Sequence, residues 1–289
     1  MNVSGQIAAV TAGWEEREQE DDELAEHLGG RTVNLELYRR GEEALAEDPE
    51  LATARHAALD EWRELRRLYN VRLSHHMAAL REIVSRDGPR RLLDRELEEA
   101  LEAVRVLDQR HLDKVGAVRA EFFATWGPAS RPSVTTHRRE LERILSKCEA
   151  LAIAGGHVGA LLDRLRLFDL MSLWPDRPVF AWSAGAMALA EQVVLFHDSP
   201  PQGSSHAEVL DFGLGVYRRL LPMPHARRRL RLKSRSRVAR LARRFASFVC
   251  VPMDEGDHLR IEGASLWAEA PLRRLTPEGE VKALDVKGK

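Results

Sequence analysis

Residues 178–186 read PVFAWSAGA, and this stretch decides how the chain is interpreted. An apolar run, typical of a buried strand, leads into Ser183, and a helical pattern follows. A nucleophile elbow has this order: a strand ends, the chain turns sharply, and a serine hydroxyl is held at a helix start. The turn has room only for small residues two before and two after the serine, here Ala181 and Gly185. An ordinary strand-to-helix turn with a helix-capping serine is the alternative interpretation.

A second apolar run, at residues 151–154, ends in Gly155 and Gly156 before another helical pattern. Glycines at the carboxyl end of a strand let the backbone approach a ligand closely, so their N–H groups can form an oxyanion hole. We therefore expect the N–H groups of Ala184 and of Gly155 or Gly156 to hold a developing oxyanion. A serine hydrolase also needs a base and an acid that orients the base, and Asp198 and His225 follow downstream in that order.

At these residues the chain resembles the S51 peptidases, the group of aspartyl dipeptidase (peptidase E) and cyanophycinase, within the class I glutamine amidotransferase-like fold. The resemblance covers residues 5–40 and 135–275. It rests on these segments: Gly155-Gly156-His157, Trp182-Ser183-Ala184-Gly185-Ala186, Pro224-His225, and residues 254–263. It implies that Ser183 is the nucleophile, that the glycine turn forms the oxyanion hole, and that His225 is the general base. The family's acid lies at the spacing that Asp198 has from Ser183.

The acid has alternatives within the chain. Asp211 lies in a segment, residues 209–215, that the family uses to lead toward the histidine, and we favour Asp198 over it. Glu191 and Glu255 are more remote candidates.

The base has two rivals, His197 and His206. His197 adjoins Asp198, and adjacent residues of a strand point to opposite faces, so the two are not expected to share a site. His206 lies in a loop rich in glycine and serine. A surface histidine beside basic neighbours is the alternative interpretation of His225.

The chain departs from the family at three places. Ala181 replaces a glycine, His157 replaces the asparagine that usually follows the glycine turn, and a long helical stretch separates two halves of the sheet. The departures leave the substrate preference open. They also support a second hypothesis, namely that the protein is a catalytically inactive scaffold that binds a partner through its helical stretch. A glutaminase of the amidotransferase type is disfavoured, because that chemistry uses a cysteine at the elbow.

The hydrophobic periodicity predicts an α/β fold, a mostly parallel sheet with helices on both faces that a helical hairpin interrupts. Residues 1–40 and 133–275 form the core, residues 41–132 the helical insertion, and residues 276–289 a polar tail. The opening predicts a strand at 6–13, a helix at 15–27 and a strand at 32–37. Later helices are expected at 134–147, 157–170, 184–191 and 236–245, and strands at 150–154, 178–182, 193–196, 248–253, 258–262 and 265–268.

Two long helices are expected in the insertion, because apolar residues recur there at spacings of three and four. Residues 87–89, Asp-Gly-Pro, break the run, and residues 127–132 end it. One stripe contains Leu59, Trp62, Leu65, Leu68 and Tyr69, and the other Leu93, Leu97, Leu101, Val104 and Leu107. Such a hairpin could pack on the core, form a homodimer or bind a protein partner.

Arginine is concentrated in residues 227–244. A solvated loop and helix face is one interpretation. Recognition of an acidic substrate is the other, because the run follows His225 directly and a guanidinium binds a carboxylate in a fork. Nucleic-acid binding is disfavoured by the net charge of −1 and by the lack of interleaved aromatic residues.

The composition of the 289 residues limits which other classes of protein the chain can belong to. No apolar run approaches the roughly 18 residues that span a bilayer, and residues 1–11 do not resemble a signal peptide. The two cysteines, Cys148 and Cys250, lie in apolar runs and are expected to be buried rather than disulfide-bonded, which fits the cytoplasm. No cluster has metal-ligand spacing, and no cofactor motif is found. The sequence therefore predicts a serine hydrolase that cleaves a peptide or related amide bond of a small, acidic substrate.

Overall fold

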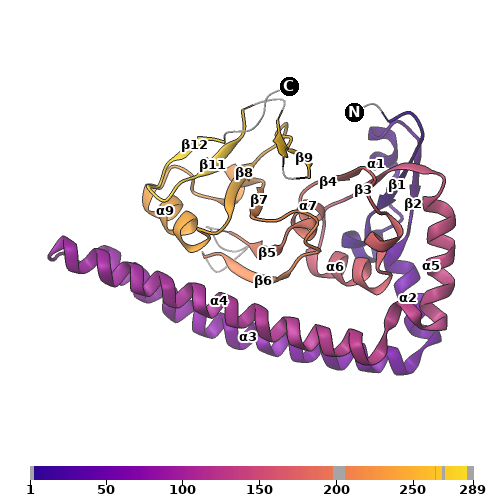
Figure 1. Cartoon of the computed structure of the whole chain (residues 1–289), viewed down its shortest axis with the longest axis horizontal. Coiled ribbons are helices and arrows are strands. Elements are labelled where there is room, and N and C mark those ends of the chain that lie inside the picture. The colour runs from indigo at the N-terminus through magenta and orange to yellow at the C-terminus, as the bar shows by residue number, and fades with distance from the viewer. Residues whose placement is uncertain (1–2, 198–205, 264, 269–270, 285–289) are drawn as a thin grey trace. The chain divides into compact units, whose positions relative to one another are not determined.

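The computed structural model describes residues 3–197, 206–263, 265–268 and 271–284 (Figure 1). Its contacts divide the chain into two compact units. The first unit contains Met1–Asp60 and Val118–Leu189, and the second contains Glu61–Ala117 and Ala190–Lys289. The fold is mixed α/β, as predicted.

A parallel sheet of four strands is the centre of the first unit, with the order β2-β1-β3-β4. The strands are β1 (Gln6–Val10), β2 (Thr32–Asn34), β3 (Cys148–Ile153) and β4 (Val179–Ala181). Ala8 of β1 pairs with Leu151 of β3, far along the chain. The apolar runs of β1 and β3 are nearly continuous because these central strands are buried, which is typical of parallel sheets. The predicted parallel sheet is thus confirmed.

Three helices of the first unit follow the predicted positions closely: α5 (Pro132–Leu145), α6 (Val158–Leu167) and α7 (Ala184–Leu189). This unit also contains α1 (Asp22–His27), α2 (Leu37–Glu47) and the short 3-10 turns η2 (Pro128–Ser130) and η3 (Leu170–Leu173). α2 begins at Leu37, where the last residue of a strand was expected. Pro132 is the first residue of α5, where its missing N–H costs no helical hydrogen bond.

The expected single helix at 15–27 is wrong in one respect. Its first part is the 3-10 segment η1 (Ala12–Arg17), which is kinked where Glu15 has φ 59° and ψ −126°, and α1 begins only at Asp22. Glu18 stabilises this bend, because its buried carboxylate accepts hydrogen bonds from the N–H groups of Tyr38 at 2.9 Å and Arg39 at 3.0 Å. These N–H groups lie in the first turn of α2 and have no partner within the helix.

The predicted helical insertion is present as α3 (Pro49–Ser85) and α4 (Arg90–Trp126), which lie side by side (Figure 1). The chain reverses at the Asp-Gly-Pro break, as expected. Tyr69 and Leu101 of the two predicted stripes are buried, whereas Leu68 is 50% exposed. No helix within the described ranges has the length and apolar character needed to cross a membrane.

The second unit contains smaller sheets. An antiparallel pair is made by β5 (Gln192–Leu195) and β6 (Glu208–Phe212), and a parallel pair by β7 (Leu220–Pro224) and β8 (Val249–Met253). Two hairpins follow, β9 (Arg260–Glu262) with β10 (Ser265–Trp267), and β11 (Arg273–Leu275) with β12 (Val281–Ala283). Besides its parts of α3 and α4, the second unit contains the helices α8 (Ala226–Arg229) and α9 (Arg235–Arg244).

Four of these strands, β6, β7, β11 and β12, were not predicted from the sequence. In β7 the two prolines Pro222 and Pro224 argue against a strand, yet they are accommodated because this strand has one partner, β8, in its two-stranded sheet. β12 lies within residues 276–289, which were predicted as a polar tail, and pairs with β11.

A buried polar network joins the insertion to α9 and β6 within the second unit. Arg244 forms two hydrogen bonds with the Asp108 carboxylate, both 2.7 Å, and a third with the carbonyl oxygen of Ala207 at 2.6 Å. The Tyr69 hydroxyl donates to Asp108 at 2.8 Å and accepts from the N–H of Val209 at 3.1 Å. Because both charges and the hydroxyl are satisfied, the network can lie inside the protein.

Candidate active site

Three loops meet at one edge of the parallel sheet in the first unit. They follow β1, β3 and β4, and the carboxyl ends of parallel strands share an edge, where α/β proteins place their ligands. The N–H of His157 donates to the carbonyl oxygen of Gly13 at 2.6 Å, which ties the β1 and β3 loops together. A side chain at Gly13 would place its Cβ 2.5 Å from the carbonyl oxygen of Gly155, and one at Gly156 would place its Cβ 2.2 Å from the carbonyl oxygen of Gly13. The two loops can therefore approach only because residues 13 and 156 are glycine.

Ser183 lies in the turn between β4 and α7 and has a left-handed backbone, with φ 51°. This conformation costs a residue other than glycine about 1–2 kcal/mol. It also differs from the extended backbone that is typical of a helix-capping serine. The carbonyl oxygen of Ser183 accepts a hydrogen bond from Met187 at 3.2 Å, which starts the helix directly behind the serine. The geometry therefore favours the elbow interpretation over the capping interpretation.

Glycines pack tightly around this turn. A Cβ at Gly185 would lie 2.3 Å from the carbonyl oxygen of Ile153, a contact that real side chains do not make. A Cβ at Gly155 would lie 2.9 Å from the Cβ of Ser183 and 3.1 Å from its Oγ. The structure thus brings the predicted nucleophile and Gly155 together. Ala184 follows Ser183 as the first residue of α7 and is buried.

The second residue of the glycine turn, Gly156, has φ 110°, a conformation that side chains disfavour. His157, which departs from the family pattern, begins α6: its Nδ1 accepts a hydrogen bond from the N–H of Ala160 at 3.0 Å. The ring proton is therefore on Nε2 when the histidine is neutral. Glu15 lies nearby, with its Oε1 3.9 Å from the same Nδ1.

Gly13 and Glu15 are residues of the candidate site that are not among the residues predicted from the sequence. Gly13 stands at the end of an apolar run, and this position is the signal that identifies it. Glu15 gave no signal, because its acidic side chain fits the helical pattern that was predicted there.

The predicted base, His225, belongs to the second unit. It lies at the carboxyl end of β7, exposed, with a left-handed φ of 58°. The carboxylate of Asp254, at the end of β8, holds the turn that follows: it accepts a hydrogen bond from the N–H of Arg227 at 2.9 Å and pairs with Arg273 at 3.1 Å. Asp254 belongs to the segment 254–263 of the family resemblance, and the sequence alone does not predict its contact with this turn.

The candidate acids are placed as follows. Asp198 lies outside the described residues. Asp211 is buried in β6, and its Oδ1 accepts a hydrogen bond from the N–H of Phe212 at 2.7 Å. Glu191 accepts a hydrogen bond from the N–H of Arg219 at 3.2 Å, and Glu255 is exposed. All three described candidates belong to the second unit.

The rival histidines differ in their surroundings. Burial, and then the charge of Arg229, lowers the pKa of His197. His206 lines a pocket of the second unit. Because Ser183 and the histidines belong to different units, the assembly of a triad stays a prediction.

Both cysteines are buried and free, as expected. Burial raises the pKa of Cys148 and raises that of Cys250 to about 12, so both thiols stay protonated near neutral pH. A protonated thiol is a poor nucleophile. Neither cysteine competes with Ser183 as the reactive group.

No family model matches the chain, and no curated protein matches it. Among solved structures, the chain is similar to a peptidase from an acI-B1 Actinobacterium. The two share 17% sequence identity with a TM-score of 0.36, over 65% of this chain and 75% of the other.

Proposed function

We propose that this protein is a serine hydrolase of the S51 type, which cleaves a peptide or related amide bond of a small substrate. The observation that carries the proposal is the backbone of Ser183. A non-glycine residue keeps a left-handed conformation here, between a strand and a helix, and its side chain faces a glycine loop. Strain of this kind persists where the surrounding structure enforces it, and it gathers at functional sites.

In the proposed reaction, the Ser183 hydroxyl attacks the substrate's carbonyl carbon and its proton passes to His225. The N–H groups of Ala184 and of Gly155 or Gly156 donate hydrogen bonds to the oxyanion, and each donor is worth roughly 3–4 kcal/mol. Collapse of the tetrahedral intermediate breaks the C–N bond, and the leaving amine takes the proton from His225. Water then hydrolyses the ester on Ser183 by the same proton transfers in reverse.

The acid that orients His225 is Asp198 in this proposal, with Asp211 as the alternative. The spacing from Ser183 supports Asp198. Asp211 is less suitable, because one of its carboxylate oxygens already accepts a hydrogen bond from the backbone N–H of Phe212. Replacing each by asparagine separates the two, because the true acid sets the histidine tautomer and its loss should lower kcat by orders of magnitude.

The substrate is proposed to be a small peptide with an acidic residue. The family resemblance and the arginine-rich residues 227–244 directly after His225 support this choice. Acidic and neutral dipeptides of equal size would show the preference as a difference in kcat/KM.

The test is hydrolysis of a panel of dipeptides by the full-length protein and by its Ser183→Ala variant. Ser146→Ala is the matched control, because Ser146 is exposed at the end of α5 in the same unit and its hydroxyl donates only to the carbonyl oxygen of Arg143 among the bonds described. We expect hydrolysis by the wild type and the control and none by Ser183→Ala. Equal turnover by Ser183→Ala would refute the proposal. Absence of turnover in all three folded proteins would favour the inactive scaffold.

A further inference from the structure

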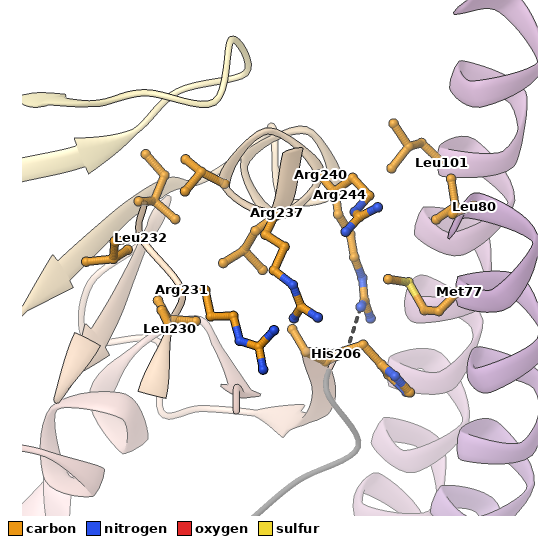
Figure 2. A pocket seen from close by; sticks show the side chains of 14 residues that line it. Met77, Leu80, Leu101, His206, Leu230, Arg231, Leu232, Arg237, Arg240 and Arg244 are labelled. Carbon is orange, nitrogen blue, oxygen red and sulfur yellow. Dashed lines mark hydrogen bonds between the residues drawn. The ribbon is translucent and has the colours of Figure 1, made fainter. Parts of the chain in front are cut away.

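The arginine-rich residues 227–244 lie in two places of the second unit. Figure 2 shows four of the arginines around a pocket: Arg231, Arg237, Arg240 and Arg244. Arg227 lies in the short helix α8, directly after the turn of the predicted base, His225. Its backbone N–H donates to the Asp254 carboxylate at 2.9 Å, and its Nε lies 3.4 Å from the same carboxylate. An acidic side chain thus contacts the turn that carries the predicted base.

The backbone of His225 has a conformation that its surroundings must stabilise. Its φ of 58° and ψ of 38° lie in the left-handed region. For a residue other than glycine this region is disfavoured by about 5- to 30-fold. The carbonyl oxygen of His225 accepts hydrogen bonds from the N–H groups of Arg228 at 3.1 Å and Arg229 at 3.0 Å, which close the turn. Because φ and ψ set the direction of the Cα–Cβ bond, opening of this turn would redirect the imidazole ring.

Asp254 is itself held in place beside this turn. His225 and Asp254 follow β7 and β8, and the residues that precede them are paired in the parallel ladder. The Asp254 side chain is 12% exposed, and Arg273 of β11 donates to its Oδ2 at 3.1 Å. The backbone N–H of Asp254 donates to the Asp257 carboxylate at 2.8 Å. These contacts fix both the backbone and the carboxylate of Asp254.

The hydrogen bond from Arg227 to Asp254 satisfies a group that the helix cannot satisfy. Arg227 is the second residue of α8, and the first N–H groups of a helix have no partner within it. A hydrogen bond to a carboxylate is stronger than one between neutral groups. Asp254 therefore stabilises the closed turn from outside the segment that contains His225.

We propose that Asp254 is a positioning residue, which fixes the backbone of His225 and thereby the direction of its imidazole ring. It acts through the backbone N–H of Arg227. The inference rests on the proposed function, in which His225 takes the proton of Ser183. Loss of the hydrogen bond lets the left-handed backbone relax, so that only a fraction of the molecules keeps the base in place. This loss lowers kcat and leaves KM unchanged, because Asp254 does not contact the substrate.

The first experiment measures dipeptide hydrolysis by the full-length protein and its variants. We expect Asp254→Ala to lower kcat by about 5- to 30-fold, the factor by which the left-handed backbone is disfavoured. Asp254→Asn should keep kcat within about threefold of the wild type, because the amide oxygen still accepts the Arg227 N–H. Glu64→Ala is the matched control, since Glu64 forms an exposed ion pair with Arg67 in the same unit, and it should leave kcat unchanged.

Nuclear magnetic resonance of protein with isotope-labelled histidine observes the His225 ring directly. The spectrum of His225→Gln assigns its signals. We expect Asp254→Ala to shift and broaden these signals, and Asp254→Asn and Glu64→Ala to leave them in place. This measurement needs no turnover, so it separates the two proposals: a wild type that cleaves no dipeptide contradicts the proposed function alone.

Unchanged His225 signals in folded Asp254→Ala would overturn the inference, whatever the wild type hydrolyses. A loss of kcat in Asp254→Asn as large as in Asp254→Ala would also overturn it, because the charge and not the hydrogen bond would then matter. Circular dichroism shows whether each variant is folded. If Asp254→Ala does not fold, Asp254→Glu replaces it: this variant keeps the charge but displaces the acceptor, and a kcat no lower than that of Asp254→Asn would overturn the inference.

Discussion

The buried pair of Asp108 and Arg244 permits a quantitative prediction about stability. Their side chains are 10% and 3% exposed, and the guanidinium bonds both carboxylate oxygens at 2.7 Å. The change Asp108→Ala would leave the Arg244 charge inside the protein, with the Ala207 carbonyl oxygen and the Tyr69 hydroxyl as its remaining described hydrogen-bond partners. An uncompensated buried charge costs far more than the net stabilisation by the intact pair.

We expect Asp108→Ala to lower the free energy of unfolding by about 3–5 kcal/mol. The assay is urea denaturation followed by circular dichroism. Glu82→Gln serves as the control, because Glu82 and Arg86 form an ion pair in which each side chain is 64% exposed. Removal of such a surface pair should cost less than about 1 kcal/mol.

A double variant distinguishes the loss of the pair from the loss of packing. Asp108→Leu combined with Arg244→Met removes both charges and should recover much of the stability that Asp108→Ala loses, because no charge is left buried alone. If Asp108→Ala lowered the free energy of unfolding no more than Glu82→Gln does, Arg244 would not need the Asp108 carboxylate as its buried counter-charge.

Three further predictions concern the site and the pH dependence of stability. Gly185→Ala should destabilise the protein by about 2 kcal/mol, because the new Cβ would lie 2.3 Å from the Ile153 carbonyl oxygen and overpacking costs about 1–3 kcal/mol. An unchanged midpoint of urea denaturation would contradict this prediction. Gly155→Ala should slow the reaction of Ser183 with a fluorophosphonate by ~10-fold or more, because the new side chain displaces the serine and the oxyanion donors. The rate would be measured from labelling reactions quenched at successive times. Burial lowers the pKa of His111 below its usual 6.5, so the folded state favours the neutral ring. The contribution of this neutral ring to the free energy of unfolding is complete above about pH 6.5 and is lost as the pH falls below that value. His111→Gln should therefore flatten the fall of the urea midpoint between pH 7 and pH 5, and an equally steep fall in the variant would count against it.

The sequence predicted the parallel sheet and the elbow because their signals are local. Continuous apolar runs mark buried parallel strands, and the run at Leu151 ends where β3 ends, within one residue. The glycine two residues after Ser183 reflects a lack of space, because a Cβ at Gly185 would lie 2.3 Å from the carbonyl oxygen of Ile153 in the neighbouring strand. A position with so little space is visible in the sequence directly, as a glycine at a fixed distance from the serine.

The remaining features depend on contacts between distant parts of the chain. Glu15 fits a helical pattern, yet the loop after β1 holds it at φ 59°. β7 contains two prolines and forms a strand because β8 pairs with it. Asp254 stabilises the turn after His225 from the end of another strand. No periodicity within a single segment encodes these three arrangements.

Covalent labelling shows whether Ser183 is an activated nucleophile. The folded full-length protein would be incubated with a small fluorophosphonate, and the modified peptide would be identified by mass spectrometry, with Ser183→Ala treated in parallel. We expect one adduct on Ser183 in the wild type and none in the variant. An adduct that persists in Ser183→Ala, or a folded wild type that stays unmodified at Ser183, would show that Ser183 is not an activated nucleophile.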